Sequence, residues 1–143
     1  MMVLVDTSIW SLALRRRSAD LSPEQGRLRQ ELSELIREGR ARLIGPIRQE
    51  LLSGIREESQ YRKLRDNLRA FDDVVLLTDD YERAASLSNQ CRAGGVTGSP
   101  IDFLICAVAV RCQWPVLTTD GDFRVYAKHV PIKLFAQRPH RGA

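Results

Sequence analysis

Met2-Val3-Leu4-Val5-Asp6-Thr7-Ser8 is the stretch that decides the fold class. Four apolar residues, two of them β-branched, are followed at once by three polar ones. This pattern is typical of a short buried strand with polar groups at its carboxyl end. Similar apolar runs recur along the chain, and each is predicted to be a strand: 42–45, 74–77, 116–119 and 130–135.

Helical patterns separate these runs. Ser22, Pro23 and Gln25 form a capping box with proline in the first turn, and Gly39 is a stop signal. Apolar residues at helical spacing and similar start signals predict the further helices 9–16, 46–56, 59–71, 79–94 and 99–110, and one that begins at Phe123. Strands that alternate with helices predict an α/β sandwich around a mainly parallel sheet.

Length and composition limit the classes of protein. The 143 residues fit one domain, 1–143. No run of about 18 uncharged apolar residues exists, so no membrane span is expected. The start Met1–Asp6 lacks the features of a secretory signal, and three cysteines without a Cys-x-x-Cys pair suit a reducing, cytoplasmic setting. Two histidines are too few for a His-based zinc site.

Four acidic residues stand where a site is expected. Ligands of parallel sheets bind outside the carboxyl ends of the strands. Asp6 ends the first predicted strand and Asp120 follows a later one. Asp102 lies in the first turn of the most apolar helix, and Glu50 flanks the apolar stripe of the helix 46–56. Gly54, one turn after Glu50, would let another backbone or a ligand approach closely.

Each acid has a simpler interpretation. Asp102 lies three residues after Ser99 and could only close a capping box. Asp6 and Asp120-Gly121 could be turn residues, and Glu50 a solvated helix residue. Asp122 is interpreted as the cap of the helix that Phe123 begins.

Taken together, the acids favour a metal site. Two carboxylates about 5 Å apart repel by on the order of 3 kcal/mol at an effective dielectric of about 20, so a cluster needs a cation. All-oxygen ligands suit Mg²⁺, with Mn²⁺ as the alternative. Such an ion polarises a phosphoryl oxygen and activates water. Neither a phosphate-binding Gly-rich loop nor a Ser-His-Asp arrangement is visible in the sequence.

Four motifs, in order along the chain, give a resemblance to a known family. They are Val5-Asp6-Thr7-Ser8-Ile9-Trp10, Gln49-Glu50-Leu51-Leu52-Ser53-Gly54, Ile101-Asp102-Phe103-Leu104-Ile105-Cys106-Ala107 and Leu117-Thr118-Thr119-Asp120-Gly121-Asp122-Phe123. With these motifs the chain resembles PIN-domain ribonucleases, and most of all the VapC toxins of toxin–antitoxin pairs. The resemblance implies a PIN-like α/β/α sandwich and a Mg²⁺-dependent RNA endonuclease.

The resemblance also implies roles for individual residues. Asp6 and Asp102 would be the principal metal ligands, and Glu50 and Asp120 would hold metal-bound waters or a second ion. The hydroxyls of Thr7 and Thr118 would support these ligands. Asp122 also fits an acidic position of some members, so the choice of the fourth acid between Asp120 and Asp122 stays open.

The same resemblance implies partners: a VapB-type antitoxin, a second copy of the chain in a homodimer, and RNA. The net charge is +4, and all but three of the 22 basic residues are arginine. Arginine binds phosphate bidentately, so Arg15, Arg16 and Arg48 are candidate RNA contacts, with solvated helix faces as the alternative. The segment 94–100 before Asp102 is predicted to be a rim loop.

Two other functions remain as alternatives. One is a non-catalytic module of the same fold that binds RNA or protein, although the retention of all four acids argues against it. The other is a metal-dependent phosphatase of the haloacid dehalogenase type. That class needs a second aspartate two residues after the first, where this chain has Ser8.

Overall fold

A computed structural model describes residues 1–138, and a four-stranded sheet of order β3-β2-β1-β4 lies at its centre. β1 (Val3–Val5) pairs with β2 (Ala41–Ile44) and with β4 (Val116–Leu117), while β2 also pairs with β3 (Asp73–Val74). Every pairing is parallel. The expected α/β class with a parallel sheet is therefore confirmed.

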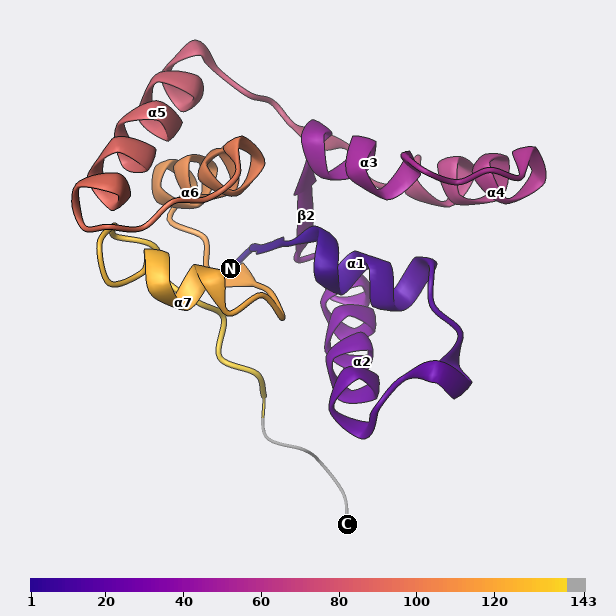
Figure 1. Ribbon diagram of the computed structural model, residues 1–143. Coiled ribbons are helices and arrows are strands. Elements are labelled where there is room, and N and C mark those ends of the chain that lie inside the picture. The colour runs from indigo at the N-terminus through magenta and orange to yellow at the C-terminus, as the bar shows by residue number, and fades with distance from the viewer. Residues whose placement is uncertain (139–143) are drawn as a thin grey trace.

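Helices flank the sheet on both sides. Figure 1 shows α5 and α6 together on one side and α1 and α2 on the other. The helices are α1 (Thr7–Leu14), α2 (Pro23–Arg37), α3 (Gly45–Leu52), α4 (Glu58–Leu68), α5 (Thr78–Ala93), α6 (Pro100–Cys112) and α7 (Asp122–Tyr126), with a short 3₁₀ turn at Ser18–Asp20. None of the helices in the described range is long and apolar enough to cross a bilayer.

Local signals set most helix ends. Ser22 and Gln25 form both hydrogen bonds of the predicted capping box at the start of α2. Ser99 caps α6 by accepting a hydrogen bond from the Asp102 N–H. Gly94 follows α5, and Gly95 takes the left-handed conformation with φ +82°. These ends were visible in the sequence because each depends on residues only a few positions apart.

Several boundaries differ from the predictions. The strand 74–77 is wrong beyond its start: β3 ends at Val74, Val75 is 71% exposed, and the Leu77 N–H turns to Asp80 at the beginning of α5. The segment 130–135 contributes a single parallel bridge, between Leu134 and Val116, and no full strand. Short apolar runs at a sheet edge lack the partners that would extend them.

The end of α3 also differs. α3 stops at Leu52, before the predicted end at Arg56, because Gly54 adopts φ +86° in the turn that follows. Apart from Gly54 and its two chain neighbours, no atom of the described chain would lie within 4 Å of a Cβ at this position. The glycine is therefore explained by its backbone conformation and not by the close approach of another backbone.

The core binds the first strand to both helical layers. Val3, Leu4 and Val5 are fully buried, and α6 is buried from Phe103 to Ala109. Trp10 of α1 donates a hydrogen bond from its indole N–H to the Val5 carbonyl and packs edge-on against Phe71. The residue after β1 is thus held in a rigid setting, which matters for the site below.

Arg48 of α3 joins this helix to the end of α4. Its guanidinium donates hydrogen bonds to the carbonyl oxygens of Leu68 and Phe71, and to the Asp73 carboxylate at 2.9 Å. Two of the three acceptors are backbone groups that follow or end α4. Arg48 therefore stabilises a chain reversal, and its hydrogen-bonding nitrogens are already engaged.

We expect Arg48→Met to lower the free energy of unfolding by about 2 kcal/mol, because it removes the guanidinium donors to the Phe71 and Leu68 carbonyls and leaves the Leu68 carbonyl with the Phe71 N–H alone. Urea denaturation measures the change. The matched control is Arg62→Met on α4, whose partner Glu58 forms an exposed i,i+4 ion pair. That control should change stability by less than about 0.5 kcal/mol. Equal effects of the two variants would contradict the structural role of Arg48.

Candidate metal centre at the carboxyl ends of β1 and β4

Asp6 lies at the point where β1 ends and α1 begins. The parallel register pairs Val5 with Leu117, so the residues that follow the two strands lie side by side. Asp6 is 7% exposed, and its Oδ2 accepts hydrogen bonds from the hydroxyls of Ser8 and Thr118, both at 2.9 Å. These bonds fix the carboxylate, and within the described chain its Oδ1 receives no protein donor.

Thr118 connects Asp6 to the next acid. Its hydroxyl donates to Asp6 and accepts the N–H of Asp120 at 2.9 Å. Ser8 reinforces the same loop, because its Oγ accepts the N–H of Thr119 at 3.1 Å. Two hydroxyls therefore hold the end of β1 against the end of β4.

Asp102 projects from the first turn of α6. Its carboxylate accepts a hydrogen bond from the Tyr126 hydroxyl at 2.7 Å and does not close a capping box with Ser99. Burial raises the pKa of Asp102, and the negative charges of Asp6 and Asp120 raise it further, against the opposing effect of the Tyr126 hydrogen bond. Asp102 and Asp6 therefore interact electrostatically across the site.

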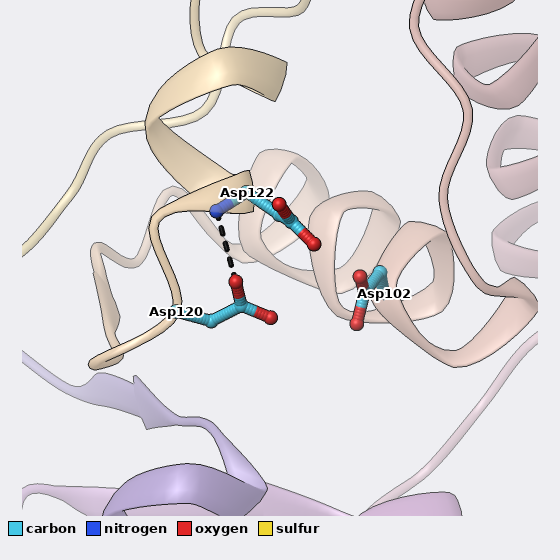
Figure 2. A group of neighbouring side chains, drawn as sticks. All are labelled: Asp102, Asp120 and Asp122. Atoms are coloured by element: carbon cyan, nitrogen blue, oxygen red, sulfur yellow. Dashed lines mark hydrogen bonds between the residues drawn. The ribbon is translucent and has the colours of Figure 1, made fainter.

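Three carboxylates form the most compact group. Asp102, Asp120 and Asp122 each offer one oxygen, and these oxygens lie within 4.8 Å of one another. Figure 2 shows Asp102 on α6 opposite Asp120, in the loop before α7, and Asp122, the first residue of α7. Asp6 is not a member of this triplet and joins it through Thr118.

The interpretation of Asp122 as a helix cap is wrong. Asp122 is the first residue of α7, and the capping position belongs to Gly121, which has no side chain to bond with. Asp120 instead accepts the N–H of Asp122 at 2.9 Å. The carboxylate of Asp122 is thus free of a capping role, because the neighbouring aspartate provides the acceptor.

Glu50 reaches the site through Thr7. It is exposed near the end of α3, and its Oε1 accepts a hydrogen bond from the Thr7 hydroxyl at 2.7 Å. Thr7 is the residue after Asp6, so this bond brings α3 to the start of α1. The structure thereby bonds Glu50 to the residue that follows Asp6, although α1 and α3 are far apart in the sequence.

The three candidate RNA-binding arginines are in different environments. Arg15 and Arg16 are exposed at the end of α1. Arg15 lines a groove of about 360 Å³ together with Arg56 and Lys63. Arg48 is engaged by the carbonyls at the end of α4, so Arg15 and Arg16 are the two available for a phosphate.

The acids of this site differ from the other buried acids of the chain. Asp80 and Glu31 are buried, and each is paired with an arginine, Arg111 and Arg138 respectively. Burial raises the pKa of Asp80, but hydrogen bonds from Arg111 and the Leu77 N–H outweigh it, so the net pKa is lowered.

No ion pair of the described residues includes Asp6, Asp102, Asp120 or Asp122. Hydroxyl or backbone donors hold the carboxylates of Asp6, Asp102 and Asp120 instead. A hydroxyl orients a carboxylate and leaves its charge uncancelled. The donor set is entirely oxygen and carries excess negative charge, which fits a hard divalent cation.

Two residues of this arrangement were missed at the sequence level. Ser8 follows Asp6 by two positions and was not assigned a role, although a hydroxyl there is within reach of the aspartate. Tyr126 follows Asp122 by four positions, which is the spacing of one helix face. That spacing was a usable signal, but the partner of Tyr126 lies on a different helix.

Comparisons with known proteins agree with this geometry. Residues 3–129 match the PIN domain family. Ribonuclease VapC11 of Mycobacterium tuberculosis is 29% identical over 133 residues, 89% of this chain and 92% of the relative.

Among solved structures, FitAcB from Neisseria gonorrhoeae superposes with a TM-score of 0.73 at 20% identity, covering 95% of this chain and 98% of that one. A toxin-antitoxin complex from Klebsiella pneumoniae gives a TM-score of 0.62 at 18% identity, covering 85% and 89%. The family match spans the sheet and all the acids described above, and the chain belongs to the PIN domain family, with homology to VapC ribonucleases.

Proposed function

We propose that this protein is an RNA endonuclease that requires a divalent cation, Mg²⁺ or alternatively Mn²⁺, and acts as the toxin of a VapBC-type pair. The observation that carries the proposal is the group of carboxylates near the ends of β1 and β4, whose negative charges are not balanced by an ion pair in the described residues. The relatives support it, since VapC11 is named a ribonuclease and the Klebsiella structure is a toxin-antitoxin complex.

In this proposal the chain's own residues have distinct tasks. Asp6 and Asp102 bind the ion, and Asp120 and Glu50 orient its waters or hold a second ion. Asp122 adds a third carboxylate beside Asp102 and Asp120. When bound, the cation polarises the phosphodiester and lowers the pKa of the attacking water. The hydroxyls of Ser8, Thr118 and Thr7 keep the carboxylates oriented, so no reorganisation is needed as charge develops.

We also propose protein partners for this chain, and the toxin-antitoxin complex among the similar structures supports an antitoxin. An antitoxin would keep the nuclease inactive by covering the group of carboxylates, and two copies of the chain would form a homodimer. RNA binding would need cations that position the phosphates, and Arg15 and Arg16, which are exposed at the end of α1, are the candidates.

Cleavage should depend on both principal acids. We expect Asp6→Asn and Asp102→Asn each to slow RNA cleavage about 1,000-fold, because loss of one ligand removes about 4 kcal/mol of transition-state stabilisation. A gel assay on structured RNA with Mg²⁺, repeated in excess EDTA, measures this. Asp72→Asn, an exposed acid away from the site, is the control and should cut normally. Full activity in EDTA would end the proposal.

Metal binding should also change stability. We expect Mg²⁺ at ten times its Kd to stabilise the wild type by about 1.4 kcal/mol and raise Tm by about 4 °C. In EDTA at neutral pH, Asp102→Asn should melt above the wild type, because it removes a half-buried charge that the neighbouring charges of Asp6 and Asp120 repel. With Mg²⁺ present, the difference in Tm between Asp102→Asn and the wild type should become smaller or change sign.

The difference in stability between Asp102→Asn and the wild type should depend on pH in a defined direction. The pKa of Asp102 is raised above its usual value of 3.8 in the folded state, so the folded protein favours the protonated form. The advantage of Asp102→Asn in EDTA should therefore vanish as the pH falls to about 4 and grow as the pH rises through the raised pKa. A wild-type Tm that does not change when millimolar Mg²⁺ is added would contradict the metal site.

The fourth acid is decided by a pair of variants. The Asp120 carboxylate accepts the Asp122 N–H, and its backbone N–H donates to Thr118, whereas Asp122 is exposed. We expect Asp120→Asn to slow cleavage about 100-fold and Asp122→Asn about tenfold, because the fixed carboxylate provides the better prepared ligand. Rates at saturating Mg²⁺ measure both. A larger loss for Asp122→Asn would assign the role to Asp122.

A further inference from the structure

Tyr126 is the last residue of α7 and is only 1% exposed. Its hydroxyl donates a hydrogen bond of 2.7 Å to Oδ2 of Asp102 on α6. Asp122 precedes Tyr126 by four residues, so one face of α7 presents a carboxylate and a hydroxyl to the same partner. Neither the family motifs nor the acidic positions include this tyrosine.

The ring of Tyr126 is tightly fixed. Phe103 and Phe123 pack against it, with ring centroids 5.0 and 5.3 Å away. Gly98, in the predicted rim loop, lies against the hydroxyl, and a Cβ at this position would collide with it. Gly98 is not among the glycines with positive φ, so space and not backbone conformation explains the missing side chain. The loop is shaped around the tyrosine hydroxyl.

A carboxylate at a metal site needs such a constraint. The χ2 torsion of aspartate is broad, so the carboxylate rotates easily about its last bond. A donor on Oδ2 restricts this rotation and leaves Oδ1 available. Outer hydrogen-bonding partners of metal ligands contribute a factor of about 10 to 100 in metal affinity or activity when they are removed.

We propose that Tyr126 is a positioning residue that orients Asp102 for the divalent cation, and that Gly98 provides the space its hydroxyl requires. This inference rests on the proposed function of the acidic site. The arrangement links the rim loop 94–100 to the metal ligand directly, because a displacement of Gly98 would move the hydroxyl that holds Asp102.

Tyr126→Phe is the main test, because phenylalanine keeps the ring and its packing and removes only the hydroxyl. We expect Mg²⁺ to bind about tenfold to 100-fold more weakly, as measured by calorimetry on the full chain. Cleavage should fall at low Mg²⁺ and recover substantially at high Mg²⁺. A residue that served packing alone would not change the Kd for Mg²⁺. Tyr81→Phe, on the exposed face of α5, is the matched control and should behave as the wild type.

Gly98→Ala provides a second and independent route to the same contact. It should weaken Mg²⁺ binding by a similar factor through displacement of the hydroxyl. In the Tyr126→Phe background it should cause no further loss of Mg²⁺ affinity, because the hydrogen bond is already absent. Circular dichroism and melting in EDTA check that each variant is folded, and Gly98→Ala keeps the test decisive if Tyr126→Phe does not fold.

The outcomes separate this inference from the proposed function. Wild-type affinity for Mg²⁺ in both Tyr126→Phe and Gly98→Ala, with wild-type RNA cleavage intact, overturns the positioning role alone. A wild-type protein that neither binds Mg²⁺ nor cleaves RNA overturns both proposals. Weaker Mg²⁺ binding in the two single variants, with no added effect in the double variant, supports the assignment of Tyr126.

Discussion

The parallel pairing of β1 with β4 is the constraint on which the site depends. The Asp6 N–H donates to the Leu117 carbonyl at 2.9 Å, and this bond places Thr118 beside the Asp6 carboxylate. At this edge α1 begins with Thr7, whose hydroxyl bonds to Glu50, and the loop that follows β4 leads to Asp120. If the register slipped by one residue, the side chains after each strand would face the opposite side of the sheet.

The buried and half-buried acidic residues of the protein fall into two groups that differ in the side chains that contact them. Asp80 and Glu31 are paired with arginines and contribute to the stability of the fold, whereas the acids of the site are held by Ser8, Thr118 and Tyr126. An arginine would cancel the negative charge, and a hydroxyl preserves it. The site therefore keeps mutual repulsion in the folded chain, which is the condition that favours a cation over an internal ion pair.

Much of the fold follows from short-range patterns. The capping box of α2, the Ser99 cap, the glycine stops and the apolar stripes are interactions within a few residues, and they located α2, α5 and α6 to within about two residues. The wrong predictions concern strand ends, because pairing between distant segments decides where a strand ends. β3 and the segment around Leu134 have apolar composition, but the length of a strand depends on how many residues find a partner in the sheet.

The sequence by itself determined the α/β class, the parallel sheet and which acids stand after strands or at helix starts, because these depend on periodicity and local turns. Only the tertiary structure decided that Asp122 joins Asp102 and Asp120, that Arg48 is engaged at the end of α4, and that Tyr126 holds Asp102. These contacts cross between elements far apart in the chain. Their geometry depends on strand register and helix packing, which no local pattern encodes.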